Sequence, residues 1–562
     1  MYVRKTFRKN KNGSTVEYLA LAINTWDQER KSSIAKNIYN FGRLRPETRD
    51  EMVRLAKSIA RVWNLTVIDP IDDGEETSHQ PGEDPFPDGV EEVQTRELGI
   101  VYVLEAIWNQ LGIGEELTRL RKASGCSVEY ERALLAMTLN RLSEPESKLG
   151  VWDRWLEDKV YLSNGEGLKL HQMYEAMDFL HKHAALLEEV IFFKTADLLN
   201  LSVDLIIYDT TTVSFHIDYA DEEGDGLRQF GHPKEGGWAP QVIVALAVTR
   251  EGFPVRSWVF PGNTTDVKTV AKVKADLRGW KLSRCLFFGD AGTNSLENRE
   301  ELARACGTYV LAVRAGSLKE VKEKVLNRRG KYQTVSDNLK VKEVVVGDGV
   351  LHRRYFLCYN SSEAKRQRLH RENVISDLEE KLASHQDKSA TAKWAIELMA
   401  SGRYGRYLEI NKHGKIYISS KKVKEAARLD GKWVLITNDD TISAQDAAQG
   451  YKGMMVIERC FRSLKRTQIK MGPMYHWLPR RIEAHVKICV LALLLQRMVE
   501  YKLDEPWFRI SRKLRRLQAT EYQTETHQFF RRNRVAPEVA AILKKLEISR
   551  PKQVMAVVER PS

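Results

Sequence analysis

Short apolar runs rich in β-branched and aromatic residues recur along the middle of this chain, separated by polar or glycine-containing segments. Such runs, bounded by turn-forming residues, are typical of buried strands. Apolar residues at helical spacing follow the third and the fourth run. The predicted strands are residues 205–208, 241–249, 253–260, 285–288 and 309–313, and the predicted helices are residues 266–277 and 296–306.

The predicted order is three strands, a helix, a strand, a helix and a strand. This is the order of a ribonuclease-H-like core, an α/β fold, whose first part we place at residues 199–313. An apolar run at residues 432–437 predicts a return to this core, so its second part is expected at residues 431–500. Residues 314–430 carry further β pattern and predict a largely β insertion subdomain. A passive insertion in a surface loop remains the alternative.

Two of the predicted strands lead into an acidic residue. Asp209 follows the run at residues 205–208, and Asp290 follows Gly289 after the run at residues 285–288. We therefore expect both carboxylates on, or at the end of, buried strands. An Asp that follows a strand is most often a turn or cap residue, so neither residue alone indicates catalysis.

A third acidic residue, Glu458, lies in a segment with a helical pattern. One face of this predicted helix is apolar, and at about 100° per residue the opposite stripe combines Glu458 with a phenol and cations. A Glu among Arg and Lys is usually part of a solvated, ion-paired face. The order of strand Asp, strand Asp and helix Glu is what favours a shared site. The stripe consists of Tyr451, Met454, Glu458, Arg462 and Lys465.

Three carboxylates at one edge of a sheet have a definite chemical use. Mg²⁺ prefers oxygen ligands, usually one or two carboxylates together with waters and substrate phosphate. Asp209, Asp290 and Glu458 could thus hold two Mg²⁺ or Mn²⁺ ions. Two such ions about 3.5–4 Å apart activate an attacking water or 3′-hydroxyl and stabilise the leaving oxygen at phosphorus. We expect the cations beside Glu458 to hold the strand that is cut.

Five segments of the chain resemble those of one protein family. They resemble bacterial insertion-sequence transposases of the DDE class, and the resemblance covers about residues 199–500. The match is closest to the large "IS-four" group. The segments are YDTTTVSF (208–215), GFPVRSWVFPGNTTD (252–266), FFGDAGTNS (287–295), DGKWVLITND (430–439) and YKGMMVIERCFRSLK (451–465).

The signature of that group around its last acid is Tyr-x2-Arg-x3-Glu-x6-Lys. In this chain it falls on Tyr451, Met454, Glu458 and Lys465. Met454 therefore stands where the group has Arg. Arg459 or Arg462 could supply the missing positive charge.

The resemblance implies a cut-and-paste DNA transposase, which cleaves DNA at the ends of an insertion sequence and joins the freed 3′-hydroxyls to target DNA. It implies double-stranded DNA partners, namely the terminal inverted repeats and the target, and a homodimer in the DNA complex, with one active site per end. A non-catalytic DNA-binding regulator and a ribonuclease-H-like nuclease that does not join strands remain alternatives. The implied metal ligands are Asp209, Asp290 and Glu458, and the implied DNA contacts are Tyr451, Arg459, Arg462 and Lys465.

Four flanking regions complete the predicted organisation. Residues 1–68 predict a basic α+β module, and residues 69–94 predict an acidic linker that lacks Lys and Arg. Residues 95–198 are nearly all helical in pattern, and by resemblance they are expected to bind the inverted repeats. Residues 501–562 are basic, and we expect a helical region there.

Composition agrees with a DNA partner and disfavours several other classes of protein. The chain has 89 Lys and Arg against 76 Asp and Glu, a formal net charge of +13, which favours contact with phosphates. Its six cysteines include no Cys-x2-Cys pair, a pattern typical of reduced thiols in a cytoplasm. The apolar run at residues 488–495 is far shorter than the about 20 residues of a membrane span. We expect a cytoplasmic protein, associated with the nucleoid when it acts.

Overall fold

The structure, a computed structural model, divides into two units, Met1–Asp88 and Gly89–Ser562. Each is described by itself. In the first unit the description covers the backbone of three strands. In the second it covers residues 90–559 except for 166, 202, 218, 222–225, 235, 283–284, 305–306, 315–318, 348–352 and 386–388.

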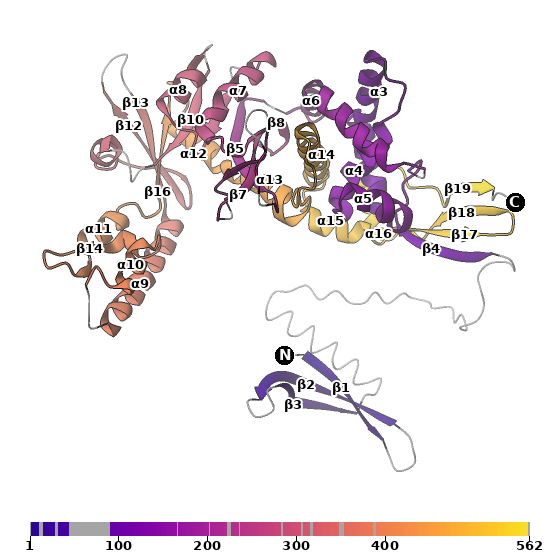
Figure 1. Cartoon of the computed structure of the whole chain (residues 1–562), viewed down its shortest axis with the longest axis horizontal. Helices are drawn as coiled ribbons and strands as arrows, with labels where there is room; N and C mark the ends of the chain where they lie inside the picture. Colours follow the sequence, from indigo (N-terminus) through magenta and orange to yellow (C-terminus); the bar gives the residue numbers. More distant parts are fainter. Residues whose placement is uncertain are drawn as a thin grey trace. The chain divides into compact units, whose positions relative to one another are not determined.

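The first unit contains a three-stranded antiparallel sheet (Figure 1). Its strands, in spatial order, are β1 (Tyr2–Lys9), β2 (Thr15–Asp27) and β3 (Ser32–Arg43). The helical part of the module predicted at residues 1–68 lies outside the described residues, and so do residues 69–89 of the predicted acidic linker.

The core of the second unit is a ten-stranded mixed sheet. Its central elements are β5 (Leu205–Ser214), β6 (Gln229–Gly231), β7 (Ala239–Val248), β8 (Pro254–Pro261), α7 (Asp266–Gly279), β9 (Leu286–Gly289), α8 (Leu296–Ala303) and β10 (Tyr309–Val313). β5, β7 and β8 form an antiparallel meander, and β9 and β10 continue the sheet parallel to β5. The short β6 pairs with the start of β7. A meander followed by two strands parallel to its first strand is the ribonuclease-H-like arrangement, so the predicted order of elements is confirmed here.

The first part of β5, residues 205–208, is continuously apolar because both faces of the sheet are covered there. Leu205 and Ile207 belong to one hydrophobic cluster, while Ile206 and Tyr208 belong to another, as the two-residue period of a strand requires. The second cluster includes α7. The first includes α13 (Met454–Arg462) and α14 (Pro479–Leu503).

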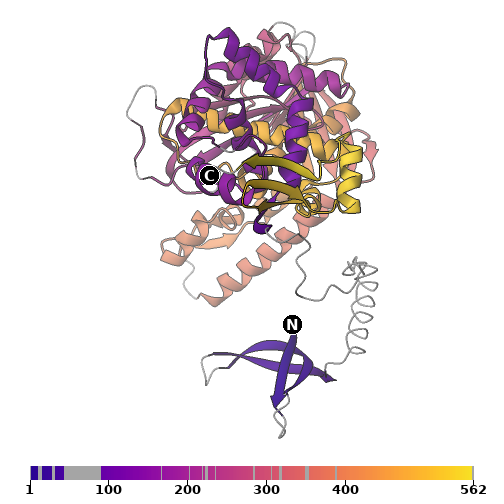
Figure 2. The same cartoon turned by 90° about the vertical axis from the view of Figure 1, so that its right-hand side faces the viewer.

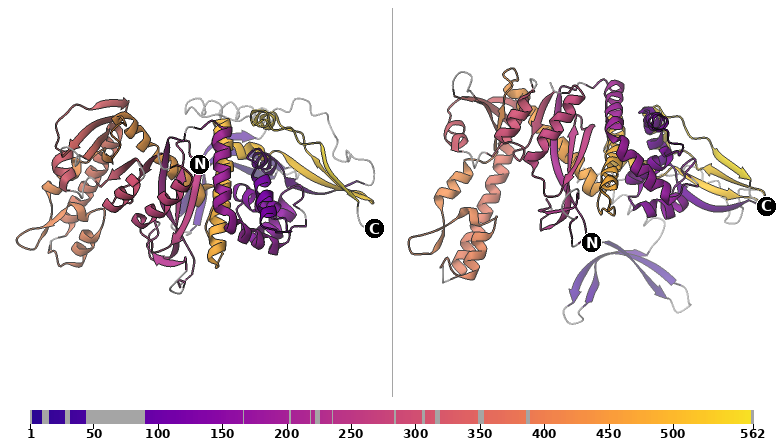
Figure 3. Two further views of the ribbon diagram at one scale, coloured as in Figure 1. Left: turned by 90° about the horizontal axis from the view of Figure 1, so that it is seen from above. Right: turned by 45° about the horizontal axis from the view of Figure 1, so that its top comes forward.

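A group of helices lies beside the sheet. It consists of α2 (Gly99–Gln110), α3 (Ile113–Ala123), α4 (Glu131–Ser143), α5 (Lys148–Gly150), the π-helix η1 (Val151–Lys159) and α6 (Leu170–Leu198). The helix α14 packs against α2, α4 and α6 on one side and against β8 on the other, and Figure 3 shows α6 and α14 running alongside each other. Burial on all sides explains the uniformly apolar run at residues 488–495. Within the described part of the chain, no helix is long and apolar enough to cross a membrane.

The insertion at residues 314–430 differs from the largely β subdomain that the sequence predicts. After the π-helix η3 (Val321–Val325), its main strands extend the core sheet, because β13 pairs with β16, which also pairs with β10. The sequence pattern detects these strands but not their partners, which lie far away along the chain. The strands are β11 (Gln333–Ser336), β12 (Leu339–Val346), β13 (Arg353–Asn360) and β16 (Lys432–Thr437).

Residues 361–430, which we call the inserted subdomain, leave the sheet after β13 and return at β16. They are mostly helical and have a hydrophobic cluster of their own. The two ends of the inserted subdomain meet, since the backbone N–H of Asn360 donates to the carbonyl of Gly431 at 2.7 Å. Its elements are α9 (Ser361–Ser384), α10 (Lys393–Ala400), the 3₁₀ turn η5 (Gly405–Tyr407), β14 (Leu408–Ile410), β15 (Ile416–Ile418) and α11 (Ser420–Ala427).

Residues 501–562 also differ from the helical region that the sequence predicts. Three strands of this region join one strand from residues 91–97 in a four-stranded sheet, which lies beside two helices (Figure 2). Its strands carry many charged and half-exposed residues, so they lack the apolar alternation by which strands are recognised. One strand, β4, also crosses the predicted end of the linker at residue 94. The elements are α15 (Trp507–Leu514), β17 (Gln518–Gln523), β18 (His527–Arg532), α16 (Pro537–Lys545), β19 (Val554–Glu559) and β4 (Glu91–Glu97).

Candidate active site

Asp209 and Asp290 lie on adjacent parallel strands. The register pairs Ile207 of β5 with Phe288 of β9, and two positions further along it brings Asp209 level with Asp290. Asp209 lies within β5, while Asp290 directly follows β9. Asp290 Oδ1 accepts hydrogen bonds from the backbone N–H groups of Gly292 and Thr293, at 2.9 and 3.1 Å. The turn after β9 thus fixes the Asp290 carboxylate at the sheet edge.

Tyr451 and Glu458 lie on two helices rather than on the single helix that the sequence predicts. Tyr451 belongs to α12 (Ala444–Lys452) and Glu458 to α13, with Gly453 between them. A Cβ at Gly453 would lie 3.3 Å from the side chain of Ile207, and one at Gly450 only 2.3 Å from the ring of Phe288. The two glycines therefore allow this helix pair to approach β5 and β9 closely.

Tyr451 is influenced by the charges of all three predicted acids. Burial raises the pKa of Tyr451 to about 12, with further contributions from the negative charges of Asp290, Glu458 and Asp209. Charges act on a neighbour appreciably only over short distances in water. Tyr451 therefore lies among the carboxylates, half-buried, while the side chain of Glu458 is exposed.

A fourth carboxylate, Asp266, joins the site from the first turn of α7. Its Oδ1 accepts a hydrogen bond from Thr210 Oγ1 at 2.5 Å. A Cβ at Gly292 would lie 3.1 Å from Asp266 Oδ2 and 3.2 Å from Asp290 Oδ1, so Gly292 lies between the two acids. Asp266 ends one of the five resembling segments, but no apolar run or polar stripe marks it in the sequence as a site residue.

Burial and like charges shift the ionisation of Asp209. Burial raises the pKa of Asp209 to about 7, Lys234 opposes this rise, and the neighbouring Asp290 and Asp266 add to it. Lys234 Nζ lies 3.8 Å from Asp209 Oδ1 and also donates to the carbonyl of Thr210. The site is thus short of positive charge, and Lys234, another residue missed in the sequence, supplies part of it.

The cations that follow Glu458 lie at different places. Lys465, in the π-helix η6 (Ser463–Thr467), donates from Nζ to Thr211 Oγ1 at 3.4 Å, two residues beyond Asp209 on the same face of β5. Arg459 and Arg462 are exposed on α13. Met454, which the sequence places on the polar stripe, is only 8% exposed and so cannot substitute for a phosphate-binding Arg.

The donor set fits a hard divalent cation. Carboxylate oxygens are the ligands that Mg²⁺ prefers. The raised pKa of Asp209 reflects first the cost of keeping a buried carboxylate ionised, to which the charge of Asp290 adds. Across the described part of the chain, no three His, Cys, Asp or Glu side chains lie close enough to bind one ion. Mg²⁺ does not require three, because waters and substrate phosphate complete its shell.

A ribonuclease-H-like sheet with acids on its two central strands and on a following helix defines the DDE class of proteins. Residues 204–495 match the family model described as Transposase DDE domain. This match spans more than half of the 562 residues, and the chain belongs to that family.

Other comparisons add little. The solved structures include a piggyBac transposase synaptic complex with hairpin DNA, which aligns with a TM-score of 0.33 and 9% identity over 74% of this chain and 78% of that chain. A TM-score this low does not establish a shared fold. No curated protein matches the chain.

Proposed function

We propose that this protein is a DNA transposase that cleaves the ends of an insertion sequence and transfers the freed strands into target DNA. The observation that carries the proposal is that Asp209 and Asp290 lie level on adjacent parallel strands, in a chain of the DDE family, while the charge of Glu458 reaches the same Tyr451 as theirs. The "IS-four" group is the member type that the residues at 451–465 favour.

Each residue of the site has a distinct part in this proposal. Two Mg²⁺ or Mn²⁺ ions held by Asp209, Asp290 and Glu458 would supply Lewis acidity for phosphoryl transfer. Lys465 and the exposed Arg459 and Arg462 would bind phosphates of the strand to be cut.

Three further groups assist the metal-binding acids or the DNA strand. Asp266 holds Thr210 beside Asp209, and Lys234 balances part of the negative charge before the metal arrives. Tyr451 stays a neutral phenol at physiological pH, because its pKa is raised to about 12. It can therefore donate a hydrogen bond to a phosphate oxygen.

A cavity beside Asp290 supports a path for DNA. It has a volume of about 480 Å³ and reaches from Gly292 to β13. Arg299 and Lys319 line it, together with Arg353, which is paired with Glu320 at 2.7 Å. Cations in a groove next to the acids suit a polyanionic strand. We propose a homodimer in the DNA complex, because two ends require two active sites.

The test is a cleavage and strand-transfer assay on DNA that carries the inverted repeats flanking the gene, with Mg²⁺. We expect D209N, D290N and E458Q to bind this DNA but to lose cleavage and joining by roughly a thousandfold or more. D197N, which alters an exposed Asp on α6, serves as the matched control and should retain full activity.

The same assay separates the proposal from its alternatives. Cleavage without joining would identify a nuclease. DNA binding without cleavage by the wild type would identify a regulator. Unchanged cleavage by the three acid variants would show that these carboxylates are structural and would refute the proposed mechanism.

A further inference from the structure

A second cluster of buried charged groups lies away from the acids, around a cavity of about 470 Å³. The cavity is formed by the end of α4, the start of α5, the segment around residues 470–476 and α14. Arg141 and Lys148 are each only 3% exposed and His485 only 5%. A volume of this size is typical of small-molecule sites, so the cavity has room for more than a water.

Three of the residues that line this cavity each have a buried polar atom without a partner. Among the described residues, neither Arg141 Nε nor Lys148 Nζ has a hydrogen-bond acceptor, and His485 Nδ1 has no hydrogen-bond partner. Buried polar groups are nearly always paired, and an unpaired buried cation costs more than an unpaired neutral group. Three such atoms around one cavity indicate a ligand that pairs with them.

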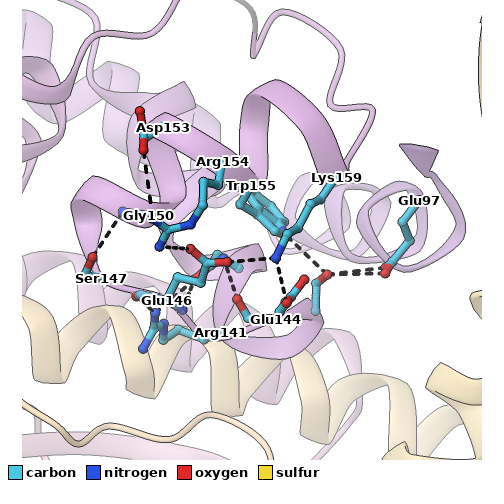
Figure 4. A network of polar contacts seen from close by, with 12 residues as sticks. Glu97, Arg141, Glu144, Glu146, Ser147, Gly150, Asp153, Arg154, Trp155 and Lys159 are labelled. Carbon is cyan, nitrogen blue, oxygen red and sulfur yellow. Dashed lines mark hydrogen bonds and ion pairs between the residues drawn. The ribbon is translucent and has the colours of Figure 1, made fainter. Parts of the chain in front are cut away.

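The cavity carries little negative charge to balance these cations. Glu146 lines it, but its carboxylate is engaged by Arg154 at 2.9 Å and by Lys159 at 3.1 Å (Figure 4). The guanidinium of Arg141 meets uncharged acceptors, including the side-chain oxygen of Asn140 at 2.9 Å. Cys489, close to His485, is a neutral thiol because burial raises its pKa.

The hydrogen bonds of His485 narrow the chemistry of the ligand. His485 Nε2 lies 3.0 Å from the carbonyl of Met471, so this nitrogen carries the proton and donates it. Burial keeps the pKa of His485 well below its usual value, which leaves Nδ1 as an acceptor. A ligand that satisfies all three atoms must accept from Arg141 and Lys148 and donate to His485.

We propose that this cavity binds a singly protonated phosphate group, as inorganic phosphate or as the terminal phosphate of a nucleotide or DNA 5′-end. Such a phosphate has oxygens that accept from the two cations and one P–OH that donates to His485 Nδ1. The internal phosphodiester of a strand lacks this proton. Tyr174 and Tyr475 line the cavity with aromatic rings, which suit the sugar or base attached to a phosphate.

The lowered pKa of Lys148 agrees with an anion-binding site. Burial, and then the charge of Arg141, lower the pKa of Lys148 to about 7. An anion bound beside it would favour the protonated amine. A DNA 5′-end as the ligand rests on the proposed function, whereas inorganic phosphate does not.

Binding is measured on the full-length protein by titration calorimetry and thermal unfolding at constant ionic strength. The probes are inorganic phosphate, a 5′-mononucleotide, and short duplexes with 5′-phosphate or 5′-hydroxyl ends. We expect phosphate-bearing probes to bind and stabilise the wild type, and K148Q to lower their affinity by about tenfold or more, since hydrogen bonds to a charged group are lost. K122Q, at an exposed lysine on α3, is the control and should bind like the wild type.

A rim variant covers the case in which K148Q does not fold. Leu149 lines the cavity and is 48% exposed, so L149E places a negative charge at the mouth without disturbing the buried groups. We expect L149E to weaken phosphate binding severalfold and L149Q to leave it unchanged, because like charges repel. Equal binding by the two would overturn the proposal.

Each of the remaining outcomes also supports or overturns the proposed phosphate site. Binding of free phosphate and mononucleotide alone, or of 5′-phosphorylated duplex alone, supports the site and identifies the source of the phosphate. The absence of binding by any probe, or unchanged binding in K148Q, overturns it. Sulfate that binds as tightly as phosphate would overturn the assignment of a protonated ligand. None of these readouts needs strand cleavage, so a failure here is distinct from a failure of the proposed transposase activity.

Discussion

The acidic site on β5 and β9 and the cationic cavity beside α4 and α14 are opposites built on one principle. Each gathers like charges in a poorly hydrated place, and each shifts a pKa toward neutrality, that of Asp209 upward and that of Lys148 downward. Like charges repel and lose hydration on burial. A fold that keeps them together is organised around a partner of the opposite sign.

The two regions differ in how they offset the repulsion between their like charges. The acidic site has an internal cation, Lys234, 3.8 Å from Asp209. The carboxylate nearest the cationic cavity, Glu146, is already paired elsewhere. The comparison indicates that the acidic site tolerates an absent ligand better than the cavity does.

The largest expected effect concerns Lys148 in the cationic cavity. We expect K148M to raise the free energy of unfolding at pH 6 in phosphate-free buffer by up to a few kcal/mol, since each pKa unit is worth about 1.4 kcal/mol. The folded protein releases the Lys148 proton near pH 7, whereas the unfolded chain keeps it to about pH 10. Wild-type stability should therefore rise with pH across this window, and the advantage of K148M should disappear.

Urea denaturation at pH 6, 8 and 9.5 measures this, with K122M as the control. An effect of K148M that is the same at every pH would contradict a buried, titrating lysine and would indicate a packing effect instead.

The second prediction concerns the acidic side. Mg²⁺ should stabilise the wild type against thermal unfolding, by about 2.7 kcal/mol at a hundredfold excess over its Kd, because it neutralises Asp209 and Asp290. D209N and D290N should each lose most of this gain, while D197N should keep it. Equal stabilisation of all four proteins would place the metal elsewhere.

A smaller effect is expected at Asp266. D266N should lower the cleavage rate by about tenfold, because it weakens the charge-assisted hydrogen bond that holds Thr210 beside Asp209. T210V removes that hydrogen bond and should lower the rate in a similar way. Single-turnover cleavage with saturating DNA measures both, and a rate equal to that of the wild type would make Asp266 a simple helix-terminus residue.

The smallest expected effect concerns Lys465, which we expect to contact DNA beside the acidic site. K465Q should weaken DNA binding severalfold and reduce the slope of the logarithm of affinity against the logarithm of salt concentration by about one. Fluorescence anisotropy over a range of salt concentrations measures this slope, with K122Q as the control. An unchanged slope would mean that Lys465 only anchors η6 to Thr211.

The sequence predicted which elements carry the three acids, because these residues follow local patterns. Asp209 and Asp290 end apolar runs, and Glu458 lies on an amphipathic helix, so short windows suffice to find them. Asp266 and Lys234 were missed because a helix start and a loop carry no such pattern. The break at Gly453 was also missed, because the apolar spacing continues across it.

The cationic cavity could not be predicted for the opposite reason. Arg141 and His485 are far apart in the sequence, and each taken singly is an ordinary helix residue. Their meeting depends on how α14 packs among α4 and α6, which periodicity does not specify. The same limit explains the misassigned insertion, since the partner of β13 is β16, on the far side of the inserted subdomain.

That inserted subdomain has one more consequence. Because β13 and β16 are neighbours in the sheet and Asn360 bonds Gly431 across the opening, the seventy-odd residues between them amount to one very long hairpin loop. The entropy of closing a loop grows only slowly with its length. The sheet therefore sets almost no limit on the size of what hangs from this hairpin, and a short turn in its place would leave the strand pairing intact. At this insertion point, evolution could replace one inserted subdomain by another without disturbing the catalytic sheet.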